Sequence, residues 1–113
     1  MYKVMIVGHG FVGSAIASLF SDEEKVIVDP KFTDNKISDN PGIPFDAVFV
    51  SVDTPKAEGF KLLDSILQEL DYNMVEGTPV CCKSTATPEF YYEVSQKYKN
   101  CLLYTSDAAD DGS

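Results

Sequence analysis

Short apolar runs alternate with amphipathic segments along most of this chain. The apolar runs predict β-strands near residues 2–7, 25–29, 46–52, 78–83 and 100–104. Apolar side chains recur at helical spacing in two of the intervening stretches, first Val12, Ile16, Leu19 and Phe20, and later Leu62, Leu63, Ile66, Leu67 and Leu70. Strands that alternate with helices are typical of an α/β fold with a parallel sheet.

Two further segments carry turn or cap chemistry. The polar stretch Lys31–Pro44 has no apolar stripe, so it predicts a loop rather than a full crossover helix. Thr87 precedes Pro88 and Glu89, an order that predicts a helix with a threonine N-cap and proline at its first position. The acidic side chain in the first turn is favourable to the helix dipole.

The first strand runs into a glycine loop, Gly8-His9-Gly10-Phe11-Val12-Gly13. In a G-x-G-x-x-G loop the first glycine allows a tight turn, the second lets the backbone approach a pyrophosphate, and the third lets the helix lie against the sheet. The N-terminus of the following helix would then face the phosphates. We therefore expect a Rossmann-type fold, with a doubly wound, mostly parallel sheet of about five strands in one domain.

Asp29 ends the second predicted strand, nineteen residues beyond Gly10. A carboxylate at this place accepts hydrogen bonds from the adenosine ribose hydroxyls, and its charge repels a 2′-phosphate. The sequence thus predicts NAD as the cofactor. A βαβ unit without any nucleotide is the alternative.

Composition narrows the class of protein. A chain of 113 residues fits one domain, which is short for an enzyme that also carries a substrate domain. The net charge is -9 and all nine basic residues are lysines, so nucleic acid is not an expected partner. No apolar run approaches the roughly 20 residues that span a membrane, and a strand follows Met1 directly, so we expect neither a membrane span nor a signal peptide. Three cysteines without metal or disulfide spacing indicate a reducing cytoplasm and no metal site.

Small hydroxyl residues follow two other predicted strands. The third strand runs into Ser51-Val52-Asp53-Thr54-Pro55, and the fourth into Lys83-Ser84-Thr85. Ligands of open α/β sheets bind outside the carboxyl ends of the strands, where these hydroxyls could contact a ribose, a pyrophosphate or a catalytic water. Ordinary capping of strand ends is the other interpretation.

These segments together resemble the N-terminal, NAD-binding domain of the UDP-glucose/GDP-mannose dehydrogenase family. The resemblance covers nearly all of residues 1–104 and rests on four motifs in order: Val7-Gly8-His9-Gly10-Phe11-Val12-Gly13, Val28-Asp29, Ser51-Val52-Asp53-Thr54-Pro55 and Lys83-Ser84-Thr85-x-x-Pro88. Together they are much more specific than any one of them.

The resemblance implies a two-step oxidation of the C6 alcohol of a nucleotide sugar to a carboxylate, with two NAD⁺ reduced. Thr85 also matches a threonine that helps to position a catalytic water. Members of the family form homo-oligomers, which this chain alone does not allow us to infer. The implied cofactor-binding residues are Gly8, Gly10, Phe11, Val12, Gly13, Asp29, Ser51, Val52, Thr54, Pro55, Ser84 and Thr85.

Several features depart from that family. Its nucleophilic cysteine and its oxyanion-stabilising lysine and asparagine lie in segments with no counterpart here, so we expect this chain alone to be inactive. Cys81 and Cys82 lie within an apolar strand and are interpreted as small hydrophobes. No arginine is available to stack on adenine, and Lys31 or Lys36 supplies only a point charge. His9 is interpreted as a variable position that faces solvent.

The end of the chain has a different character. Residues 105–113 are mostly Asp, Ala, Gly and Ser, so we expect a disordered acidic tail after a domain of residues 1–104. The stretch 102–110 also resembles the translation of sequencing-adapter DNA, which suggests that the natural protein continues differently. Three hypotheses stay open: part of a nucleotide-sugar dehydrogenase, a stand-alone dinucleotide-binding or regulatory module, and another dehydrogenase of the β-hydroxyacid type.

Overall fold

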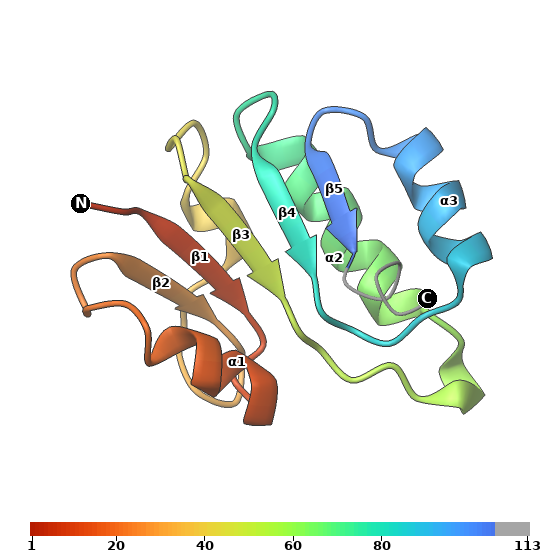
Figure 1. The fold of residues 1–113 in the computed structure, drawn as a ribbon, viewed down its shortest axis with the longest axis horizontal. Coiled ribbons are helices and arrows are strands. Elements are labelled where there is room, and N and C mark those ends of the chain that lie inside the picture. The colour runs from red at the N-terminus through yellow and green to blue at the C-terminus, as the bar shows by residue number, and fades with distance from the viewer. Residues whose placement is uncertain (106–113) are drawn as a thin grey trace.

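A parallel sheet forms the centre of the computed structural model, which describes residues 1–105 except for the side chain of Lys56. Within those residues the sheet has five strands in the order β2-β1-β3-β4-β5 (Figure 1). Their bounds are β1 Val4–Val7, β2 Lys25–Val28, β3 Ala47–Val50, β4 Pro79–Cys82 and β5 Leu102–Thr105. Every neighbouring pair is parallel. The predicted α/β, Rossmann-like fold with five parallel strands is therefore confirmed.

The connections supply the helices. In the described part of the chain these are α1 Phe11–Ala17, α2 Lys61–Asn73 and α3 Pro88–Lys97, with two short 3-10 turns, η1 Ile37–Asp39 and η2 Lys56–Glu58. The predicted loop between β2 and β3 contains only η1. Helix α3 begins as predicted, because Oγ1 of Thr87 accepts the backbone N–H of Phe90 at 3.1 Å.

Helices cover the two faces of the sheet unequally. Along β1, Met5 and Val7 belong to the core cluster that includes residues of α2 and α3, while Val4 and Ile6 pack with Ala17 of α1. Figure 1 shows these helices beside the sheet. Right-handed crossovers account for this division, since the chain moves from β1 to β2 in one direction and from β3 through β5 in the other. Most of the core lies on the side of α2 and α3.

Helix α1 is shorter than its hydrophobic pattern predicts. It ends at Ala17, and Leu19 is 77% exposed beyond it. The residues it buries are Gly13 and Ala17, and Val12 is 45% exposed instead of packing inward. Two of the predicted apolar residues, Ile16 and Phe20, pack against the core as expected, and the prediction was wrong for Val12 and Leu19. Close contact at the side-chain-free Gly13 decides which side of the helix meets the sheet.

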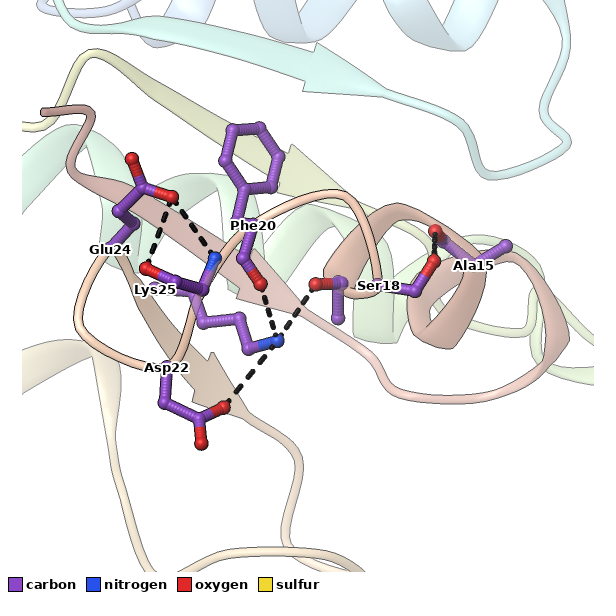
Figure 2. A network of polar contacts seen from close by, with 8 residues as sticks. Ala15, Ser18, Phe20, Asp22, Glu24 and Lys25 are labelled. Carbon is purple, nitrogen blue, oxygen red and sulfur yellow. Dashed lines mark hydrogen bonds and ion pairs between the residues drawn. The ribbon is translucent and has the colours of Figure 1, made fainter.

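A lysine holds the end of this helix. The Nζ atom of Lys25 donates to the carbonyl oxygens of Ala17 at 2.8 Å and Phe20 at 2.9 Å, and lies 3.7 Å from a carboxylate oxygen of Asp22 (Figure 2). Carbonyls at a helix C-terminus have no partner within the helix, so a cation there stabilises the chain reversal into β2.

Two observations concern the predicted boundaries. Thr105 belongs to β5, so the ordered sheet extends one residue past the predicted domain end at 104. The rest of the predicted tail, residues 106–113, lies outside the described residues. Within the described part of the chain, no helix combines the length and the apolar character that crossing a bilayer requires.

Candidate functional site

The carboxyl ends of four strands bring the predicted site residues to one edge of the sheet (Figure 1). Backbone hydrogen bonds join the segments that leave these ends. The N–H of Gly8 donates to Val28 O at 2.9 Å, and the N–H of Ser51 donates to Val7 O at 2.9 Å. The glycine loop thus lies between the end of β2, where Asp29 follows, and the end of β3.

Two of the loop glycines are required by the chain's own packing. Gly8 has a φ of +98°, and a Cβ there would lie 2.5 Å from the carbonyl oxygen of Ser51. A Cβ on Gly13 would lie 1.9 Å from the carbonyl oxygen of Gly8. Contacts this short involve backbone atoms that cannot rotate away, so both positions exclude a side chain.

Gly10 is different. Its φ is -80°, outside the left-handed region, and a Cβ built there meets no atom within 4 Å among the described residues. The packing of this domain therefore does not require glycine at this position. The space beside its backbone is open to solvent, at the place where a G-x-G-x-x-G loop admits a pyrophosphate.

Asp29 is half-buried and tied to the loop. Its Oδ2 accepts the backbone N–H of His9 at 2.7 Å, and its Oδ1 accepts the N–H of Lys31 at 2.9 Å. The N–H of Lys31, followed by that of His9, holds the pKa of the Asp29 carboxyl below its usual value. The group is ionised at neutral pH, and each oxygen keeps a lone pair for a further donor.

His9 does not simply face solvent, as the sequence interpretation had it. Its ring is stacked on that of Phe32, with centroids 3.9 Å apart and planes inclined by 23°. The imidazole is partly buried by this contact. Sequence reasoning missed Phe32, and the only signal was an aromatic residue three positions after the strand-end acid.

The hydroxyls after β3 and β4 join the two loops to each other. Oγ of Ser84 accepts the N–H of Val52 at 2.9 Å, and Oγ1 of Thr54 donates to the carbonyl oxygen of Thr85 at 2.6 Å. Helix α3 contributes as well, because the buried Tyr91 hydroxyl donates to the carbonyl oxygen of Ser84. The hydroxyls of Thr54 and Ser84 therefore already have structural partners, in line with the alternative interpretation of strand-end capping, although the sequence did not identify which groups they bind.

The remaining predicted residues differ in exposure. Phe11 is 93% exposed, and Pro55 and Thr85 are exposed as well. The Oγ atom of Ser51 is buried and has no hydrogen-bond partner among the described residues. It lies 2.9 Å from the position that a Cβ on Gly13 would take. This hydroxyl faces the loop directly beneath the start of α1.

The two groups of residues lie apart along the edge. Asp29 follows β2, and Ser84 follows β4, with β1 and β3 between them. Three strand spacings correspond to roughly 14 Å. One small ligand cannot contact both groups, whereas an elongated ligand lying across the strand ends can.

The cysteines are poorly suited to nucleophilic chemistry. Burial raises the pKa of the half-buried Cys81 thiol. Burial, with a smaller effect from Asp71, raises the pKa of Cys101 to about 11. Both side chains are protonated at neutral pH, and the thiol is a much weaker nucleophile than the thiolate.

No family model, no curated protein and no solved structure matches this chain.

The Tyr91 hydroxyl offers a test of how the loops are held. We expect Tyr91→Phe to lower the free energy of unfolding by about 1–2 kcal/mol, because the buried carbonyl of Ser84 loses a donor. Urea-induced unfolding followed by circular dichroism measures this change. Tyr92→Phe, on the same helix at a side chain that is 67% exposed, is the matched control and should have no effect. Equal stabilities of the two variants would contradict the structural role of this bond.

Proposed function

We propose that this chain binds NAD⁺ along the carboxyl edge of its sheet, as the NAD-binding part of a cytoplasmic nucleotide-sugar 6-dehydrogenase. The single observation that carries the proposal is the open side of Gly10. Internal packing requires glycine at Gly8 and Gly13, but it does not require glycine at Gly10. Close approach of a ligand to the backbone supplies a reason for glycine there.

The residues at this edge fit a dinucleotide. Asp29 is ionised and keeps free lone pairs for ribose hydroxyls, and its charge opposes a 2′-phosphate. The first N–H groups of α1 have no partner within the helix. Because α1 spans only seven residues, its few aligned peptide dipoles add little to the attraction of these N–H groups for a phosphate.

The nicotinamide half would lie toward β3 and β4. There Thr85 is exposed and can contact a ligand. NAD⁺ supplies the hydride acceptor when it is bound. The assignment to nucleotide-sugar oxidation rests on the Ser51–Pro55 and Lys83–Pro88 motifs, in which Thr85 matches a water-positioning threonine.

The cysteines favour a second candidate, a dinucleotide-binding or regulatory module that performs no chemistry by itself. Cys81 and Cys101 are protonated at neutral pH and lie within or beside the sheet. Neither is suited to attack an aldehyde. The two candidates share the NAD⁺ site and differ only in whether further residues complete the reaction.

Titration calorimetry tests the shared site. We expect NAD⁺ to bind with a Kd between about 1 μM and 1 mM, with clearly weaker binding of NADPH. Absence of NAD⁺ binding would contradict the proposal, and a preference for NADPH would contradict the role of Asp29. Mixing the chain with UDP-glucose and NAD⁺ should produce no NADH, because the reactive thiol is missing. Turnover by this chain would exclude the non-catalytic module.

A further inference from the structure

The stacked rings of His9 and Phe32 lie beside Asp29 at the end of the site that would take adenosine. We propose that this aromatic pair is the wall on which the purine base of the bound dinucleotide stacks. The proposal rests on the proposed function, since it assigns the base within the same site. It assigns a contact to the base, whereas the glycine loop and the strand-end acid account only for the pyrophosphate and the ribose.

Asp29 binds the backbone of both residues that carry the rings. Its carboxylate accepts the N–H of His9 at 2.7 Å, and its backbone carbonyl accepts the N–H of Phe32 at 2.8 Å and that of Thr33 at 2.9 Å. The glycine loop and the turn after β2, which carry the two rings, are therefore both held by one residue, and the rings stack on each other. An aromatic surface that is fixed before binding loses little conformational freedom when a base stacks on it.

Phe32 leaves more than half of its surface open to solvent. Its ring is 58% exposed despite the stack, whereas Phe45 in the core is 5% exposed. The turn does not need the stack to close, because Oγ1 of Thr33 and Nδ2 of Asn35 both donate to the carbonyl oxygen of Ile27, at 2.9 and 3.1 Å. An aromatic ring on a hydrogen-bonded turn, left exposed, is available to a ligand.

The covalent structure of adenosine places the base at this pair. The base is attached to C1′, the carbon next to the one that carries the 2′-hydroxyl. If Asp29 accepts the ribose hydroxyls, the base lies immediately beside its carboxylate, where His9 and Phe32 stand. The chain has no arginine, so of the side chains that stack well on bases only aromatic ones are available.

Stacking also has a consequence for specificity. A ring face attracts the π-surface of any base, and it does not read the hydrogen-bonding edge. We therefore expect the wall to add to the affinity for the adenosine half of the ligand. The affinity for the nicotinamide half should not depend on the wall.

Calorimetry with the two halves of the dinucleotide tests the wall. The probes are NAD⁺, ADP-ribose, which contains the adenine, and nicotinamide mononucleotide, which does not. We expect Phe32→Ala to raise the Kd for NAD⁺ and ADP-ribose roughly tenfold or more and to leave nicotinamide mononucleotide unchanged. Phe32→Tyr should retain wild-type affinity because it keeps the ring. Tyr72→Ala, at an 88% exposed aromatic on α2, is the control and should change none of the three.

Phe32→Leu distinguishes loss of stacking from a folding defect, because it keeps apolar bulk and removes the ring. We expect it to weaken ADP-ribose binding as Phe32→Ala does. Unchanged ADP-ribose affinity in Phe32→Leu, with wild-type NAD⁺ binding intact, would overturn the stacking wall and leave the proposed function standing. If the wild-type chain binds neither NAD⁺ nor ADP-ribose, the proposed function and the wall fail together.

Discussion

Gly13→Ala is expected to lower the free energy of unfolding by about 3 kcal/mol, the upper part of the range for overpacking a buried site. The added methyl would lie 1.9 Å from the carbonyl oxygen of Gly8, 2.8 Å from its carbon and 2.9 Å from Oγ of Ser51. Alanine favours a helix interior over glycine by about 0.8–1.0 kcal/mol. The steric term exceeds that gain because the opposing atoms are backbone, so α1 must move off the sheet. Urea-induced unfolding measures the loss.

Gly10→Ala is the matched comparison, because it is the same substitution three residues earlier in the same loop. A Cβ there meets nothing within 4 Å among the described residues, so we expect stability to change by less than about 1 kcal/mol. Its affinity for NAD⁺ should nevertheless fall roughly tenfold or more, since the methyl takes the space left for the pyrophosphate. A Gly13→Ala variant as stable as the wild type would show that the close contact is not what holds α1. A Gly10→Ala variant with full NAD⁺ affinity would remove the main support for the proposed site.

Asp29→Ala is expected to weaken NAD⁺ binding by about 1–3 kcal/mol, the usual loss when hydrogen bonds to a charged acceptor disappear. The discrimination against NADPH should shrink at the same time, because the charge that opposes the 2′-phosphate is gone. Calorimetric titration of both nucleotides measures the two effects together. The variant also leaves the N–H groups of His9 and Lys31 without their carboxylate partner.

Two variants separate these effects. Asp29→Asn keeps an oxygen acceptor and removes the charge, so we expect it to relax the preference against NADPH with less disturbance of the loop. Asp34→Ala removes the same charge from an exposed side chain further along the loop and serves as the control. If Asp34→Ala and Asp29→Ala weakened NAD⁺ binding equally, general electrostatics rather than a ribose contact would explain the loss.

The order of strands and helices could be predicted because each element carries a local signal. The apolar run of β1, the stripe of α2 and the Thr87-Pro88 cap of α3 each lie within a few consecutive residues. The Gly8–Gly13 spacing likewise indicates the turn after β1 without knowledge of the rest of the chain. Local signals were weaker for α1, because the hydrophobic pattern did not predict its length and predicted its buried side only in part.

The sequence by itself determined a parallel α/β sheet, a glycine loop at the end of its first strand and an acid at the end of its second, because backbone period and turn chemistry are properties of neighbouring residues. Only the tertiary structure decided how the side chains at the strand ends are used. It paired His9 with Phe32 and Val52 with Ser84, residues 23 and 32 positions apart in the chain. It also distinguished Gly10, which is open, from Gly8 and Gly13, which are closed. Such contacts depend on how separate strands lie beside one another, and no pattern of neighbouring residues encodes the spacing between segments that are far apart in the chain.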